Sequence, residues 1–297
     1  MWEFKILGID LYHIISWFYI YSFLGWLWES SFVSIRSKKI VNRGFITGPL
    51  CTIYGCGGVS IYLIASPYSD NIVLLFLIGM IVATVIEYLT AVIMETLFHA
   101  SWWNYSRKKF NFQGRICLDV SLGWGLFTLV LFYVFHPFVE FIVQLYSRKA
   151  GIIGIYIISI IFLVDFINSV VAASGFSKKM ASLESILEET TEYIKTTKLY
   201  ISSEELIDRM DLYKRTFHDD KWKNRVEEYK QRLSERLADL GIQENKKEIT
   251  QKIMELNKKY INAKNKMGFV SKRFIKAYPN ILTITKKSKD KKAEEEK

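Results

Sequence analysis

Carboxylate side chains interrupt the apolar stretches of this 297-residue sequence, among them Glu29, Glu87, Glu95 and Asp165. Because a charged group inside a membrane is costly, each one is a candidate functional residue. Glu29 lies near the end of the first apolar stretch, and Asp165 lies in the middle of the last one. Glu87 and Glu95 are eight residues apart, about 80° around a helix, and therefore share a broad face. We expect Glu87 and Asp165 to lie deep, as proton or cation sites.

Two arginines follow the apolar stretches that carry glutamates. Arg43 stands in the loop after the first stretch, and Arg115 stands in the loop after the third. One prediction is a polar pocket open to the cytoplasm, with both arginines, Glu29 and Glu95 at its mouth. The alternative is that the carboxylates pair with the arginines, Asn42 and Asn168 and so lock the helices together, since buried pairs can fix geometry without adding stability.

The segment 102–118 is the densest polar region of the apolar half. Aromatic residues beside Lys and Arg are typical of an interfacial or re-entrant segment. Asn, Tyr and Arg also suit a polar ligand such as a phosphate or a lipid headgroup, which Arg binds as a fork. The alternative is that this segment packs against the Arg43 loop and only caps the bundle. Its candidate pocket residues are Trp103, Asn104, Tyr105, Asn111 and Arg115.

The elements that must position these residues are long apolar stretches. A bilayer core of about 30 Å takes about 20 apolar residues in a helix. Backbone groups in lipid must be paired internally, so such stretches form helices. We therefore predict an all-α, polytopic transmembrane bundle of about five spans. The expected spans are Leu11–Ile35, Ile46–Ala65, Ile72–Phe98, Val120–Tyr146 and Gly151–Phe176.

The second of these stretches is rich in residues that disturb or tighten helices. It contains Gly48-Pro49 and then Gly55, Gly57 and Gly58. Broken helices build binding sites in transporters, whereas small residues also allow two helices to pack closely. Both interpretations are open at the level of the sequence.

The charges of the short loops predict an orientation. The loops after the first and third stretches each carry four Lys or Arg residues, and the loop after the second carries none. The positive-inside rule then places the N-terminus outside and the C-terminal tail in the cytoplasm of a bacterium, with the bundle in the inner membrane. Arg148 and Lys149 in the fourth loop oppose this scheme.

The sequence divides into an apolar bundle (1–176), a helical cytoplasmic tail (177–285) and a charged, disordered end (286–297). From Ser177 onwards there are 29 Lys/Arg against 21 Asp/Glu, so the tail holds +8 of the net charge of +10. A basic surface beside a bilayer favours anionic lipids over nucleic acid as a partner. Within the tail, Lys264–Ile284 mixes basic and aromatic residues. This pattern suits either a membrane-surface anchor or an ordinary docked helix.

The sequence lacks the motifs of several enzyme classes. No P-loop, zinc-protease helix motif, serine-hydrolase elbow or CxxC pair is present. The four histidines form no metal-ligand pair at helical spacing. We therefore expect no metal and no cofactor, and a transport function would need a separate P-loop ATPase subunit.

The polar motifs resemble a known family. The chain is similar to the bacterial membrane proteins described as "putative ABC-transporter type IV", or CmpB-like, over roughly residues 15 to 140. Family members usually have Asp at the position of Asn104. The resemblance implies a permease-like membrane component. The motifs that carry it are Phe23-Leu24-Gly25-Trp26 with Glu29, Asn42-Arg43-Gly44-Phe45, Gly48-Pro49, Tyr54-Gly55, Glu87-Tyr88, Met94-Glu95, Trp103-Asn104-Tyr105-Ser106, Phe110-Asn111, Gly114-Arg115-Ile116-Cys117-Leu118 and Trp124-Gly125.

Three functions remain open from the sequence. The leading hypothesis is a permease-like membrane component of a transport system. The second is a membrane enzyme that acts on a lipid-linked or headgroup substrate at the cytoplasmic face. The third is a scaffold or sensor that recruits partners through its tail. The expected partners are the lipid bilayer, a separate ATPase subunit and anionic lipids at the tail. Nucleic acid is not expected, and a homo-oligomer remains open.

Overall fold

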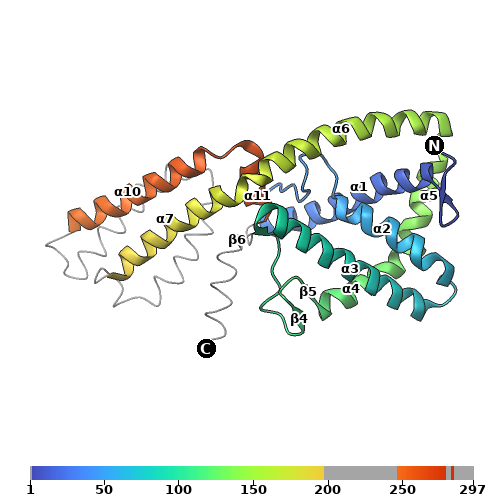
Figure 1. Cartoon of the computed structure of the whole chain (residues 1–297), viewed down its shortest axis with the longest axis horizontal. Coiled ribbons are helices and arrows are strands. Elements are labelled where there is room, and N and C mark those ends of the chain that lie inside the picture. The colour runs from blue at the N-terminus through green and yellow to red at the C-terminus, as the bar shows by residue number, and fades with distance from the viewer. Residues whose placement is uncertain (1, 197–245, 279–281, 284–297) are drawn as a thin grey trace. The chain divides into compact units, whose positions relative to one another are not determined.

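The computed structural model describes residues 2–196, 246–278 and 282–283 (Figure 1). These residues form two compact units. One contains the chain up to Ser177 together with the segment that starts at Phe269, and the other is Lys178–Gly268. The first unit holds every candidate site residue of the sequence, and it is a bundle of helices.

The helices of the bundle follow the apolar stretches of the sequence closely, except in the second stretch, where the helix begins at Thr52 and not at Ile46. The third predicted span has the same bounds as its helix, and the fourth is divided by a five-residue π-helix. The helices are α1 (Leu11–Ser37), α2 (Thr52–Ala65), η1 (Ser66–Tyr68), α3 (Ile72–Phe98), α4 (Leu118–Val130), η2 (Leu131–Phe135), α5 (His136–Gln144), α6 (Arg148–Ser174) and α11 (Phe269–Ala277).

Among the described residues, three helices are long and apolar enough to cross a membrane: Ile72–Phe98, Leu118–Gln144 and Arg148–Thr190. The chain is therefore a membrane protein by length and composition of its helices. The other two helices do not meet these criteria of length and composition, so the expectation of about five spans is not confirmed. α1 has 27 residues but many Ser, Tyr and Trp side chains, and α2 has only 14 residues.

Apolar side chains on the outside of the bundle suit a lipid environment. Along α3 they recur every fourth residue, and along α6 most large apolar side chains are more than half exposed. Large apolar patches of this kind are rare on soluble monomers. The exposed row on α3 consists of Leu77, Ile81, Val85, Leu89, Ile93 and Leu97.

Side chains at the starts of three helices satisfy backbone N–H groups that have no partner within the helix. Asp10 caps α1, Asn71 caps α3 and Ser147 caps α6, each accepting from a backbone N–H two or three residues later. Such caps stabilise a helix end by about 1 kcal/mol. They fix where the helices that carry Glu29 and Glu87 begin.

Close packing, and not a broken helix, accounts for Gly55 and Gly58 of α2. The helix runs without interruption from Thr52, and Gly48-Pro49 lies in the loop before it. A Cβ on Gly55 would lie 2.2 Å from Ser22 Oγ and 2.6 Å from the carbonyl oxygen of Phe18. Only a glycine lets α1 and α2 approach this closely.

Short antiparallel strand pairs brace the ends of the bundle. β1 (Lys5–Ile6) pairs with β2 (Ile9–Asp10), and β3 (Ala100–Ser101) pairs with β6 (Leu282–Thr283). β4 (Asn111–Phe112) and β5 (Ile116–Cys117) form a hairpin between α3 and α4. Its turn contains Gln113 and Gly114, both at positive φ, as a tight hairpin requires.

The second unit contains most of α7 (Phe176–Thr196) and all of α10 (Lys246–Asn265). Leu183, Ile253 and Leu256 are buried in it. Glu255 pairs on the surface with Lys252 and Lys259. The charged end predicted for 286–297 lies outside the described residues.

Candidate functional site

A cavity of about 220 Å³ lies inside the bundle. Its walls come from α1, α2, α3, α4 and η2, from the two loops that carry the arginines, and from Tyr278 after α11. A cavity of about 150 Å³ in another protein holds benzene, so this space suits a small organic molecule. The polar side chains on its wall are Tyr21, Trp28, Glu29, Arg43, Cys51, Tyr54, Glu87, Trp103, Tyr105, Trp124 and Tyr278.

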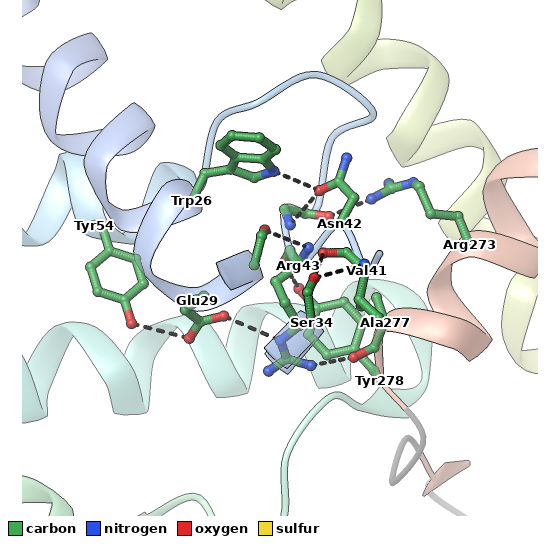
Figure 2. Close-up of polar contacts among 12 residues, drawn as sticks. Trp26, Glu29, Ser34, Val41, Asn42, Arg43, Tyr54, Arg273, Ala277 and Tyr278 are labelled. Atoms are coloured by element: carbon green, nitrogen blue, oxygen red, sulfur yellow. Dashed lines mark hydrogen bonds and ion pairs between the residues drawn. The ribbon is translucent and has the colours of Figure 1, made fainter. Parts of the chain in front are cut away.

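Glu29 sits in this wall between a tyrosine and an arginine (Figure 2). The hydroxyl of Tyr54 on α2 donates to Glu29 Oε1 at 3.0 Å. Arg43 Nε donates to Glu29 Oε2 at 3.3 Å. The charge of this carboxylate is therefore balanced by a guanidinium of the loop between the two helices.

A glycine one helical turn before Glu29 makes this geometry possible. A Cβ on Gly25 would lie 2.3 Å from Cγ of Tyr54. The tyrosine ring therefore crosses α1 at Gly25, and its hydroxyl reaches Glu29 on the next turn. The motif Gly25-Trp26 with Glu29 thus has a packing role as well as a polar one.

Glu87 faces the same cavity from the middle of α3 and is only 5% exposed. Its partners are neutral donors. Tyr105 donates its hydroxyl to Oε1 at 3.0 Å, and Trp124 of α4 donates its indole N–H to Oε2 at 3.2 Å. Within the described part of the chain, no Lys or Arg pairs with this carboxylate.

Glu95 and Arg115 form a second carboxylate–arginine pair, and this one does not line the cavity. Arg115 Nε and Nη2 lie 2.8 and 2.7 Å from Glu95 Oε2. Burial lowers the pKa of Arg115, but the hydrogen bond and charge of Glu95 outweigh it, so the pKa is raised overall. The structure therefore separates the four residues predicted at the pocket mouth into a pair in the cavity wall and a pair outside it.

Asn42 and Asp165 hold the loop between α1 and α2. Asn42 Oδ1 accepts from Trp26 Nε1 at 2.9 Å (Figure 2). The Asn42 amide donates to the carbonyl of Thr47 at 2.6 Å. Asp165 accepts from the backbone N–H groups of Thr47 and Gly48 at 3.1 and 2.6 Å. Neither lines the cavity. Asp165, expected deep beside Glu87, instead fixes the loop to α6.

Asn104 and Asn111 have a similar structural role in the loop between α3 and α4. Asn104 Oδ1 accepts from the backbone N–H of Ser106 at 2.9 Å. Asn111 accepts from the N–H of Gly114 at 3.0 Å and donates to the carbonyl of Lys108 at 2.7 Å. Both side chains shape the segment that carries Trp103 and Tyr105 to the cavity, and they stay outside its lining.

Membership of a family can be assigned at this point. A family model described as "Putative ABC-transporter type IV" matches residues 16–170. The chain belongs to this family. No match is found among curated proteins or among solved structures. The matched range contains every site residue predicted from the sequence and every cavity-lining residue except Tyr278.

The part of the cavity wall that lies beyond the type IV family match is Tyr278, directly after α11. Arg43 donates to the carbonyl of Ala277, and its guanidinium carbon lies 4.3 Å from the ring centroid of Tyr278 (Figure 2). Arg273 donates to the carbonyls of Gly44 and Phe45. Burial raises the pKa of the Tyr278 hydroxyl, which donates to the carbonyl of Arg43. α11 is thus a docked helix and not a free surface anchor.

Aromatic packing holds α11 in place on this type IV family bundle. Phe274 is fully buried, and its ring stacks on Phe45 with centroids 5.7 Å apart. Trp102 contacts both Phe274 and Tyr278 edge-on, at 4.8 and 5.0 Å. Since Phe45 and Trp102 belong to the two loops between helices, α11 joins both loops over the cavity.

Sequence reasoning missed several polar residues of the wall as site members, among them Tyr54, Trp124 and Tyr278. Tyr54 and Trp124 were used only as motif residues of the family resemblance. A polar aromatic residue in an apolar helix could also have marked them as candidates for the site. Tyr278 lies 235 residues from Arg43 and gave no signal. Among the described residues, no group of three or more His, Cys, Asp or Glu side chains could hold a metal ion.

Proposed function

We propose that this chain is the membrane-embedded, permease-like component of a transport system, and that the cavity is its substrate site. The observation that carries the proposal is the space of about 220 Å³ inside a bundle of apolar helices. Small-molecule sites are concave and mainly apolar, with a few placed polar groups. This wall has that composition, with two carboxylates, one arginine and several aromatic residues among aliphatic ones.

The loop charges support a cytoplasmic position for the polar end of the cavity. Glu29 and Arg43 lie at the end of the bundle where α1 ends and α2 begins, beside the Lys- and Arg-rich first loop. In the proposed topology, α1 is a fourth span, and α2 together with its preceding loop is a fifth. The N-terminus is then outside the inner membrane, and the tail is in the cytoplasm.

The absence of a P-loop in the sequence supports a separate source of energy. We propose a P-loop ATPase as the partner subunit. Purification of the tagged chain from its native membrane in a mild detergent should bring a stoichiometric ATPase with it. A changed lipid profile on deletion of the gene, without a bound ATPase, would favour the enzyme hypothesis instead.

Filling the cavity tests the substrate site directly. Gly57 lines the cavity, and a Cβ there would meet no atom within 4 Å. Gly57→Leu should therefore occupy the space with little disturbance of α2. Gly123→Leu on α4 is the matched control, because Gly123 has equal room for a Cβ and does not line the cavity.

The measurement is the thermal unfolding midpoint of the purified chain with a panel of small amphiphilic molecules of each charge. A ligand that binds only the folded state raises the midpoint. We expect at least one probe to stabilise the wild type and Gly123→Leu but not Gly57→Leu. Equal stabilisation of all three proteins would show that the ligand does not enter the cavity and would refute the proposed site.

A further inference from the structure

The two carboxylates of the cavity differ in their counter-charges. Glu29 is paired with Arg43, so together they add no net charge to the wall. Glu87 receives hydrogen bonds from a phenol and an indole, and neither donor carries a positive charge. When both carboxylates are ionised, the wall therefore carries one net negative charge, and it is centred at Glu87.

Aromatic rings surround the same space. Trp103, Tyr105 and Trp124 line the cavity beside Glu87, and Tyr54 meets Trp124 with ring centroids 6.0 Å apart. The face of an aromatic ring attracts a weakly hydrated cation, most strongly where water is excluded. The protein itself uses this interaction in the wall, where the guanidinium of Arg43 lies over Tyr278.

The cavity wall also has an apolar part. It includes Ile61, Ala83, Leu131 and Phe135. A ligand that fills the space must therefore present an apolar part to these residues. Burying that part in place of water is favourable, by about 0.8 kcal/mol for each methylene group.

We propose that the substrate of this cavity is a small amphiphilic cation, such as an alkyl- or aryl-ammonium compound. Its charged group contacts Glu87 and the rings of Tyr105 and Trp124, and its apolar part lies against Ile61 and Leu131. An anion of the same size would be repelled by Glu87, and Arg43 is already engaged by Glu29 and by the carbonyl of Ala277. This inference rests on the proposed function, because it specifies the ligand of the same cavity.

Three probes of similar size separate the effect of charge from the effect of size. Benzyltrimethylammonium is the cation, neopentylbenzene replaces its nitrogen by carbon, and phenylacetate is an anion of similar bulk. Each is titrated into the full chain in a non-ionic detergent, with binding heat as the readout. Gly57→Leu serves as the blank for partition into the micelle, because its cavity is filled.

The variants test Glu87 against a matched carboxylate. Glu87→Gln keeps the shape and one acceptor but removes the charge. It should weaken binding of benzyltrimethylammonium about tenfold or more, as expected when one partner of a buried charge pair is removed. Glu95→Gln removes a carboxylate of the same helix that lies outside the cavity lining, and it should leave the affinity within about twofold.

The outcomes discriminate between this inference and the proposed function. Equal binding of the cation and of neopentylbenzene, or a preference for phenylacetate, overturns the cationic substrate and leaves the cavity as a binding site. No binding of any probe refutes the cavity as a substrate site and the inference with it. If Glu87→Gln does not fold, the ratio of the cation to its neutral isostere in the wild type decides.

Discussion

Two helical hairpins build the cavity, and their polar groups follow one plan. In α1–loop–α2, the carboxylate of Glu29 receives one donor from the loop, Arg43, and one aromatic donor from the second helix, Tyr54. In α3–loop–α4, Glu87 likewise receives a loop donor and an aromatic donor of the second helix. The difference is the loop donor, which is a guanidinium in the first hairpin and a phenol in the second.

This difference gives the carboxylates of the two hairpins different roles. In the first hairpin the loop cation neutralises the carboxylate and also joins α11 to the bundle through the carbonyl of Ala277. The second hairpin places its own arginine, Arg115, on Glu95 outside the cavity. A charge balanced within the protein fixes geometry, whereas an unbalanced one can be balanced by a ligand. The following experiments test this contrast.

The largest effect is expected from Arg43→Ala. It leaves Glu29 half-buried without its cation and removes the hydrogen bond to α11. We expect a loss of about 2 to 3 kcal/mol in the free energy of unfolding, measured by denaturant titration in detergent. The double variant Glu29→Ala/Arg43→Ala should recover part of the loss, because no unpaired charge remains. A double variant as unstable as the sum of both single variants would mean that the pair does not act as a unit.

A smaller and asymmetric effect is expected from removing one hydroxyl in each hairpin. Tyr105→Phe leaves Glu87 with Trp124 alone, whereas Tyr54→Phe leaves Glu29 with the cation of Arg43. We expect losses of about 2 kcal/mol and about 1 kcal/mol, respectively, in the same denaturant assay. The order of the two values is the prediction. The reverse order would show that the phenol is not the main support of Glu87.

The smallest effect is expected from Lys108→Ala in the second hairpin. Lys108 Nζ lies 3.9 Å from Asp119 Oδ2, and both side chains are largely exposed. Exposed pairs of this kind contribute about 0 to 0.5 kcal/mol, so the unfolding midpoint should hardly change. A loss comparable to that of Arg43→Ala would indicate that loop charge in general, and not its burial beside a carboxylate, stabilises the bundle.

The sequence alone determined the helices of the bundle and the polar residues worth testing. Hydrophobic length predicts a helix directly, which is why the stretch Ile72–Phe98 coincides with α3. It failed at Ile46–Ala65, because Gly48-Pro49 and the backbone bonds to Asp165 keep residues before Thr52 out of the helix. Carboxylates in apolar stretches were also visible without a structure, since their cost in lipid marks them.

Only the tertiary structure decided which partner each polar group has. Glu29 and Glu95 have similar surroundings in the sequence, because each is followed by an arginine in the next loop. The Glu29–Arg43 pair nevertheless lines the cavity, and the Glu95–Arg115 pair does not. Tyr278 reaches the wall from the far end of the chain. The physical reason is that helix formation depends on neighbours along the chain. The partners of a buried carboxylate depend instead on how helices and loops distant in sequence pack together.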